Sequence, residues 1–98
     1  MERLFIYGLY DSEHENYMKS KSLHICKGFM YGCVYDVDGY QAAVNSNIHN
    51  HVDGDVYLLN DNFDYLDNYE GDNYERRMIS IYTEESLLSC WVYILKKF

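Results

Sequence analysis

The chain reads LDNYEGDNYER over residues 66–76, a stretch that combines a helix end, a tight turn and the start of a strand. Apolar residues recur at helical spacing from 63 to 69, and they follow several Asn and Asp residues that can act as N-caps. Gly71 stands where glycine commonly ends a helix. We therefore expect a helix over residues 62–70, with Glu70 at its C-terminal end.

Strand patterns lie on both sides of this helix. They are short apolar runs, or runs in which apolar and polar residues alternate, and they are bounded by glycine and turn residues. The expected strands cover residues 4–7, 28–37, 40–44, 51–58, 77–82 and 88–95. Asp38-Gly39 is a two-residue hairpin signal between the second and third strands. Ser12 and Glu15 form a capping box, which predicts a helix over residues 13–19.

The expected order is thus β-α-β-β-β-α-β-β. Five or six strands with two short helices indicate an α+β fold, and a strongly curved or closed sheet would remove exposed strand edges. The chain has 98 residues, a length typical of one domain, so we expect a single domain over residues 1–98.

Composition excludes several classes of function. The formal net charge is −8 and only eight residues are Lys or Arg, so neither nucleic acid nor an anionic membrane surface is an expected partner. Three widely spaced cysteines indicate reduced thiols. The apolar run near the N-terminus is too short for a signal peptide, and no segment is long enough to span a membrane. The sequence therefore predicts a cytoplasmic protein.

Several short motifs occur in a fixed order along the chain. They are Tyr7-Gly8, Asn16, Tyr40, Val52-Asp53-Gly54-Asp55-Val56-Tyr57, Leu66-Asp67-Asn68-Tyr69-Glu70-Gly71, Tyr74-Glu75-Arg76 and Cys90-Trp91-Val92-Tyr93. This ordered set resembles the gamma-glutamylcyclotransferase-like family, including its AIG2-like and gamma-glutamylamine branches. The resemblance spans nearly the whole chain and implies a small mixed β-barrel with flanking helices.

The resemblance also implies an activity and a site. Such enzymes cyclise a γ-glutamyl amine or peptide to 5-oxoproline and release a free amine, with the glutamate of the Glu-Gly pair as general acid/base. Here that glutamate is Glu70. The expected ligand is a small γ-glutamyl-type molecule, and no cofactor is expected. The residues expected to bind it are Tyr7, Gly8, Leu9, Tyr10 and Tyr74.

The loop after Tyr7-Gly8 departs from the family pattern. Leu9 replaces the usual Thr or Ser, Tyr10 replaces Leu, and Asp11 stands where a basic residue is common. These changes remove a hydroxyl and a cation, whereas backbone N–H groups remain to hold an anion. The alternative interpretation is therefore a non-catalytic module that binds a small ligand or a protein on the same fold.

Other residues have simpler interpretations. His49 and His51 could form a metal pair, but no third ligand has suitable spacing, and a surface loop explains them better. The acidic residues from 61 to 72 lack the order of a calcium loop, so capping and a solvated helix face explain most of them. Arg76 is expected to be an ion-pair partner of a nearby acid rather than a substrate ligand.

Overall fold

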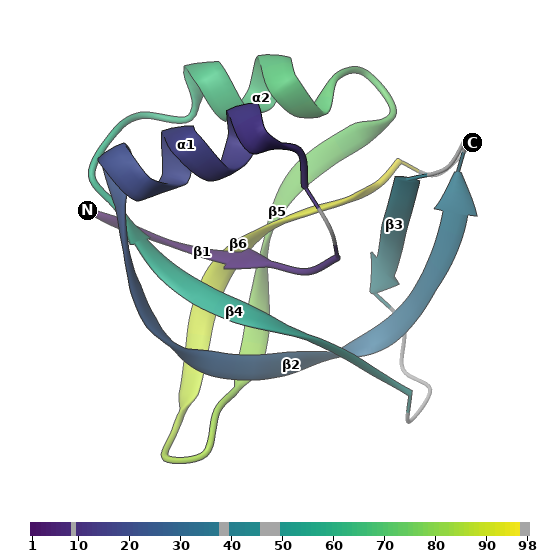
Figure 1. Cartoon of the computed structure of the whole chain (residues 1–98). Helices are drawn as coiled ribbons and strands as arrows, with labels where there is room; N and C mark the ends of the chain where they lie inside the picture. Colours follow the sequence, from purple (N-terminus) through teal and green to yellow (C-terminus); the bar gives the residue numbers. More distant parts are fainter. Residues whose placement is uncertain (9, 38–39, 46–49, 97–98) are drawn as a thin grey trace.

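The computed structural model describes residues 1–8, 10–37, 40–45 and 50–96, and the elements follow the order that the sequence predicts (Figure 1). The strands are β1 (Glu2–Ile6), β2 (Ser22–Val37), β3 (Tyr40–Asn45), β4 (His51–Leu59), β5 (Tyr74–Tyr82) and β6 (Leu87–Leu95). The helices are α1 (Ser12–Lys21) and α2 (Asp64–Glu70). The predicted hairpin residues Asp38-Gly39 lie outside the described residues.

Five of the strands close into a mixed barrel. The sheet order is β3-β2-β4-β1-β6-β5, and an additional pairing between β2 and β5 closes the five strands from β2 to β5 into a ring. Strands β1 and β6 are parallel, whereas the other described pairs are antiparallel. Strand β3 pairs with the second half of β2 and stands outside the ring. The expected small mixed β-barrel with two short helices is therefore confirmed.

The closure between β2 and β5 is narrow, and one glycine makes it possible. Phe29 pairs with Tyr82 as the single register position between these strands in the described part of the chain. A Cβ atom on the preceding Gly28 would lie only 2.7 Å from Ile81 Cγ2 and 3.0 Å from the Tyr82 carbonyl oxygen. A side chain at this position would force the two strands apart.

Buried side chains form two clusters because each barrel strand directs alternate residues to opposite faces. The first cluster fills the barrel and includes Phe5, Tyr7, Met30, Val52, Val56, Ile79, Ile81, Cys90, Val92 and Ile94. The second lies between the barrel and the helices and contains Leu4, Met18, Leu59, Phe63, Leu66 and Tyr93. The helices are therefore held to the outer face of the barrel by apolar contacts.

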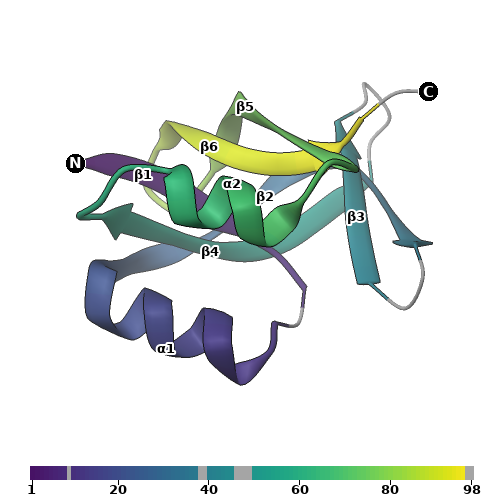
Figure 2. The ribbon, with the colours of Figure 1, turned by 90° about the horizontal axis from the view of Figure 1, so that it is seen from above.

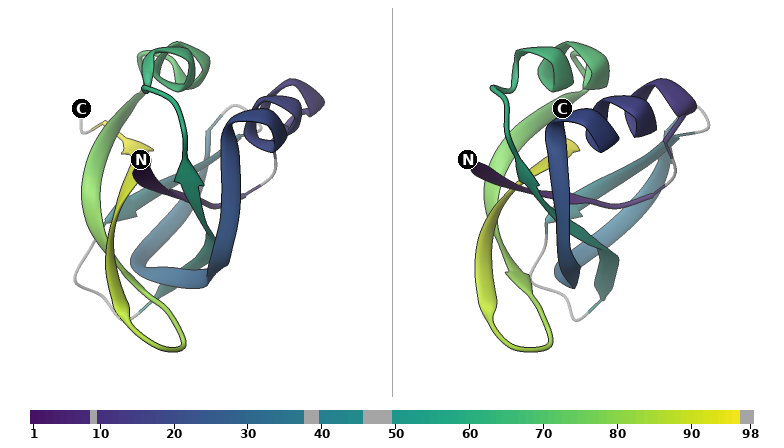
Figure 3. Two further views of the ribbon diagram at one scale, coloured as in Figure 1. Left: turned by 90° about the vertical axis from the view of Figure 1, so that its left-hand side faces the viewer. Right: turned by 60° about the vertical axis from the view of Figure 1, so that its left-hand side comes forward.

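Both helices lie at one end of the barrel, and the turn between β5 and β6 projects at the other end (Figures 1 and 3). Seen from above, α1 and α2 run alongside each other (Figure 2). Their aromatic side chains meet, since the rings of Tyr17 and Tyr65 stack with centroids 4.2 Å apart. The two helices thus form one layer at this end of the barrel, and Glu70 is the last residue of α2.

Several local details differ from the sequence prediction. Helix α2 begins at Asp64, two residues later than expected and with Phe63 as its N-cap, and β5 begins at Tyr74, three residues earlier than expected. Asp11, not Ser12, caps α1, because its carboxylate accepts the backbone N–H of His14 at 3.0 Å. Strand β2 begins directly after α1, six residues earlier than the expected start at residue 28. Its first part was missed because Leu23 and Ile25 are both exposed, so no buried face reveals the strand.

Candidate functional site

Glu70 and the loop after β1 meet at the helical end of the barrel. Glu70 is the last residue of α2, where Gly71 ends the helix with φ of 82°. The hydroxyl of Tyr10 donates a hydrogen bond to Glu70 Oε1 at 3.2 Å. Two segments that are 60 residues apart in the chain are therefore joined side chain to side chain.

The environment of Glu70 favours its protonated form. Burial raises the pKa of its carboxyl from 4.5 to about 7, and the hydrogen bond from Tyr10 opposes this shift only in part. Burial also raises the pKa of the Tyr10 hydroxyl well above its usual value, and the nearby Glu70 charge adds to the shift. The same charge contributes to the raised pKa of Tyr74, so all three groups share one electrostatic environment. Glu70 can consequently exchange a proton near neutral pH.

Tyr7 is buried in the wall of the barrel, and its hydroxyl is hydrogen-bonded to two backbone groups. It is 5% exposed, and its hydroxyl accepts the backbone N–H of Ala43 at 2.8 Å. The same hydroxyl donates to the backbone carbonyl of Tyr93 at 2.6 Å. It thereby connects β3 and β6 to the end of β1, and it satisfies two buried backbone groups.

Gly8 follows Tyr7 with φ of 81°, a left-handed conformation that glycine adopts without strain. Both residues border an open cavity of about 560 Å³, which Lys27, Tyr57 and residues 53–55 also line. Leu9, the next residue expected to bind substrate, lies outside the described residues.

His14 and Tyr69 also belong to this region, although sequence reasoning did not identify them. The rings of Tyr10 and His14 stack with centroids 3.9 Å apart, and the Tyr69 ring lies 5.1 Å from His14. His14 is 3% exposed, and burial lowers its pKa. The only sequence signal was its spacing of four from Met18, which is buried on the same helix face. This neutral imidazole supports the ring that contacts Glu70.

Arg76 fixes α2 to the barrel. Its Nε donates to Asp67 Oδ1 at 3.1 Å, which confirms the expected ion pair. The Tyr93 hydroxyl donates to the same carboxylate oxygen at 2.7 Å. The guanidinium also lies over the rings of Phe63 and Trp91, with its Cζ atom 4.0 and 4.5 Å from their centroids. Arg76 is thus committed to structure, and it orients the helix that ends at Glu70.

Comparison with known proteins identifies the family and supports the fold. The family model described as gamma-glutamyl cyclotransferase, AIG2-like, matches residues 4–98. The chain belongs to this family. An Arabidopsis thaliana protein of known solution structure is similar in fold, with a TM-score of 0.73 and 23% sequence identity. The similarity covers 96% of this chain and 68% of that protein. No curated protein sequence matches the chain significantly.

In this member of the AIG2-like gamma-glutamyl cyclotransferase family, the structure shows what the residues that depart from the family pattern at positions 10 and 11 contact. Tyr10 uses its hydroxyl on Glu70, and Asp11 caps α1. A hydrogen bond from the His14 backbone, followed by one from the Tyr69 hydroxyl, lowers the pKa of Asp11. Both residues that replace family positions therefore have defined contacts in this chain.

The remaining candidate ligands of a metal are separate from this site. His49 lies outside the described residues, and the ring of His51 stacks on Phe29 with centroids 4.1 Å apart. Among the described residues, no group of three or more His, Cys, Asp or Glu side chains could hold a metal ion. The three cysteines are free, and Cys90 is buried in the barrel. No helix in the described part of the chain is long and apolar enough to cross a membrane.

Proposed function

We propose that this protein cyclises a γ-glutamyl amine or γ-glutamyl peptide to 5-oxoproline and a free amine, with Glu70 as the general acid/base. Membership of the AIG2-like gamma-glutamyl cyclotransferase family supports this reaction type. The observation that carries the proposal is the half-buried Glu70 carboxyl, whose burial raises its pKa to about 7 next to the Tyr10 hydroxyl. A carboxyl with this pKa can both accept and return a proton at neutral pH.

The proposed chemistry is an intramolecular acyl transfer. Glu70 takes a proton from the substrate's α-ammonium group. The freed nitrogen attacks the γ-carbonyl carbon and forms the new C–N bond of a five-membered ring. The bond from that carbon to the departing nitrogen then breaks as Glu70 returns its proton to that nitrogen. The ring nitrogen loses its second proton to the departing amine, which leaves as an ammonium ion. The substrate supplies its own nucleophile, so positioning is the main task of the protein.

Neighbouring groups have supporting roles in this proposal. The Tyr10 hydroxyl stabilises the charged form of Glu70 and opposes the effect of burial. The backbone around Gly8, in its left-handed conformation, would direct N–H groups toward the substrate carboxylate or the oxyanion. Tyr74, which lies near enough for the Glu70 charge to raise its pKa, would line the pocket. Leu9 is proposed as a further pocket residue from its sequence position alone.

The test is to incubate the full chain with a panel of γ-glutamyl amines and dipeptides and to measure 5-oxoproline by mass spectrometry. We expect product with wild type and a loss of at least about 100-fold with Glu70→Gln, as for removal of a general acid/base. Glu75→Gln is the matched control, because Glu75 pairs with Arg77 on β5 and lies outside the proposed site. A silent panel, or equal turnover by Glu70→Gln, would contradict the proposal.

A second candidate is a binding module that holds a γ-glutamyl-type ligand without converting it. The hydrogen bond between Tyr10 and Glu70 favours this candidate, because Tyr10 stands where the family has Leu and occupies a carboxylate oxygen that would serve in proton transfer. Native mass spectrometry with the same panel separates the two functions. Retained, unchanged ligand supports the binding module, and 5-oxoproline formation excludes it.

A further inference from the structure

The first half of β2 has one free edge. Strands β3 and β4 lie on opposite sides of β2. Residues from Ser22 to Tyr31 pair with β4, and on the other side the first pairing is Phe29 with Tyr82. Within the described part of the chain, no strand pairs with residues 22–28 on that side. An edge of this kind presents backbone N–H and C=O groups to any extended segment that approaches it.

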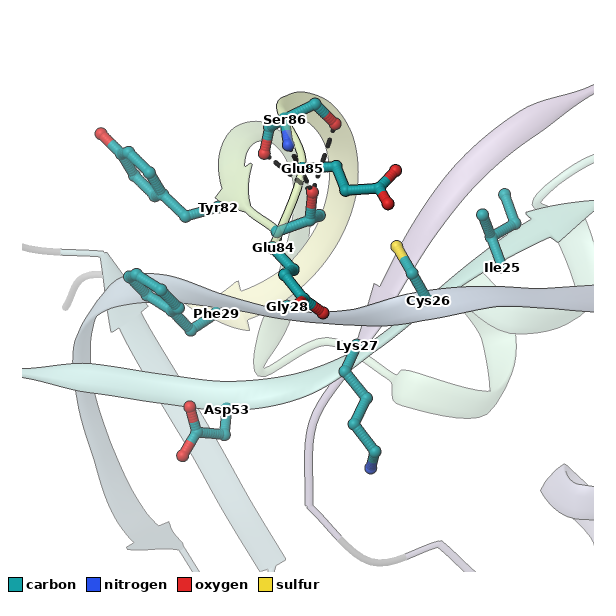
Figure 4. Close-up of a pocket in the computed structure, with 11 residues that line it drawn as sticks. Ile25, Cys26, Lys27, Gly28, Phe29, Asp53, Tyr82, Glu84, Glu85 and Ser86 are labelled. Atoms are coloured by element: carbon teal, nitrogen blue, oxygen red, sulfur yellow. Dashed lines mark hydrogen bonds between the residues drawn. The ribbon is translucent and has the colours of Figure 1, made fainter.

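A groove follows this free edge at the end of the barrel opposite the helices. Strand β5 leaves β2 after Tyr82, and the turn that leads into β6 overhangs the edge. The resulting cavity has a volume of about 660 Å³ and is lined by residues 25–29 of β2, Asp53 and residues 82–86 of the turn. Figure 4 shows the turn above β2, with Cys26 and Gly28 on the strand beneath it. The groove thus lies between the edge of β2 on one side and the polar turn between β5 and β6 on the other.

The turn is tied together by hydrogen bonds and carries negative charge. Thr83 and Ser86 are joined by a backbone hydrogen bond of 2.8 Å and by a second one from the Ser86 N–H to Thr83 Oγ1 at 3.0 Å. Glu84 extends from it toward β2, and Glu85 extends sideways from the turn; both line the groove (Figure 4). Among the described residues, no basic side chain forms an ion pair with either glutamate.

The basic residue that lines the groove, Lys27, does not neutralise these glutamates. Its side chain is 88% exposed and lies 3.8 Å from Asp55 on β4. In Figure 4 it points away from the turn. Ile25, which lines the groove, is 45% exposed, and Leu23 and Leu87, near the starts of β2 and β6, are 67 and 56% exposed. The unpaired edge of β2 therefore lies beside exposed apolar side chains and beside the negative charges of Glu84 and Glu85.

We propose that this edge binds an extended peptide segment with basic side chains, which adds a strand to β2 and places its cations against Glu84 and Glu85. Strand addition uses the backbone groups of residues 22–28, a length of about 20 Å at about 3.3 Å per residue. Alternate side chains of the peptide would contact Leu23, Ile25 and Leu87, and the others would face the turn. The turn that carries Glu84 and Glu85 lies at the end of the barrel opposite α2, which ends at Glu70, whereas Lys27, Gly28 and Asp53 line both this groove and the cavity beside Gly8.

Charge selects a basic peptide over a second copy of the chain. Each copy carries a net charge of −8, and pairing two β2 edges would bring two acidic turns together. A segment rich in Lys or Arg meets the opposite sign and gains from complementary potentials. A self-associated dimer remains a distinct outcome of the test.

The test is a display selection of random seven-residue peptides against the immobilised full chain. The best binder is then labelled with fluorescein and titrated by anisotropy. We expect net positive sequences whose affinity falls as salt rises. The double variant Glu84→Lys with Glu85→Lys should bind about fivefold to tenfold more weakly, because each exposed ion pair is replaced by a repulsive pair. Asp36→Lys with Asp72→Lys changes the net charge equally outside the groove and should bind as wild type does.

Two further measurements address strand addition itself. Hydrogen exchange should slow at backbone amides in residues 22–28 when peptide is bound. Ile25→Pro should abolish binding, because proline removes a backbone N–H from the edge. Ile25 lies where the register of β2 against β4 shifts, at a bulge, so proline is tolerated there, and a thermal melt verifies that the variant is folded.

Several results would overturn the proposal. The first is a selection that yields no binder, or only neutral and acidic peptides. The second is an equal loss of peptide affinity in the two double variants. The third is protection from hydrogen exchange that is confined to amides outside residues 22–28. Sedimentation that shows a dimer which Ile25→Pro converts to monomer would assign the edge to self-association instead.

Discussion

Replacing Glu70 by Gln should make the protein more stable at pH 8 while changing its stability little at pH 4.5. The folded state raises the pKa of Glu70 from 4.5 to about 7 because the carboxylate loses water on burial. Between these two pH values the folded chain holds a proton that the unfolded chain has released. The free energy of unfolding therefore falls as pH rises through this window, and it is constant above pH 7. The amide of the glutamine variant cannot ionise, so the variant lacks this loss.

The magnitude follows from the size of the shift. A rise from 4.5 to about 7 is 2.5 pKa units, or about 3 kcal/mol at 1.36 kcal/mol per unit. Glu70 is half-buried, and solvent screening reduces this to about 2 kcal/mol. The side-chain oxygen of glutamine can accept a hydrogen bond from the Tyr10 hydroxyl, so the variant can keep the hydrogen bond that spans 3.2 Å in wild type. We therefore expect Glu70→Gln to exceed wild type by about 2 kcal/mol at pH 8.

The assay is urea unfolding of both proteins at half-unit steps from pH 4.5 to 8. The informative quantity is the difference between the two free energies of unfolding. Burial lowers the pKa of His14, so the unfolded chain binds a proton at this residue more readily than the folded chain does. Taken by itself, His14 therefore makes the free energy of unfolding rise with pH up to the unfolded pKa near 6.5. That contribution is common to both proteins and cancels in the difference. Parallel curves for the two proteins, or a difference that grows toward low pH, would refute the reasoning.

Three further substitutions test other contacts. Tyr7→Phe leaves two buried backbone groups without their partner and should cost about 2–4 kcal/mol in urea unfolding, whereas a loss below about 0.5 kcal/mol would show that water replaces the hydroxyl. Tyr10→Phe removes the hydrogen bond that lowers the pKa of Glu70, so an NMR titration of the carboxyl should give a value above that of wild type; an equal or lower value contradicts the assignment. Gly28→Ala places a methyl group 2.7 Å from Ile81 Cγ2 and should lower the free energy of unfolding by about 1–3 kcal/mol. Unchanged stability would mean that β2 and β5 can move apart to make room for the methyl group without a loss of stability.

Most strands could be predicted because one face of each is buried in the barrel. In β6 the alternation of Cys90, Val92 and Ile94 with less buried residues is nearly complete over residues 88–95. The end of α2 was equally clear, since Gly71 adopts the left-handed conformation that its position indicates. Local patterns of this kind are fixed by short-range geometry, so the sequence displays them directly.

The start of β2 and the closure of the barrel could not be read in this way. Residues 22–28 belong to a strand edge with exposed Leu23 and Ile25, so burial does not impose a period of two there. The pairing of Phe29 with Tyr82 joins positions 53 residues apart (82 − 29) through one register position. Which strand closes the barrel depends on twist and on the space left by Gly28, and neither is a local property of the sequence.

The resemblance assigned Glu70 and Tyr10 to one candidate site, and a hydrogen bond joins them, although Tyr10 departs from the family pattern. It could not show that the Tyr7 hydroxyl is used by backbone groups from two other strands, since those partners have no side-chain signature. His14 was missed for a related reason. A buried histidine on a short helix looks like a solvated one until the rings packed on it are known.

The departure at residues 10 and 11 has a structural explanation that separates proton transfer from substrate binding. Asp11 caps α1 and so anchors the loop through the backbone of His14, while Tyr10 reaches Glu70 from the same loop. Arg76, the nearest cation in the motif that contains Glu70, is already held by Asp67. In the proposed reaction an anionic substrate beside Gly8 would be held by backbone N–H groups and by Lys27, which lines the same cavity, whereas Glu70 keeps its raised pKa. In the proposed reaction the loop would therefore select the ligand, and the burial of Glu70 would set the pH at which a bound ligand reacts.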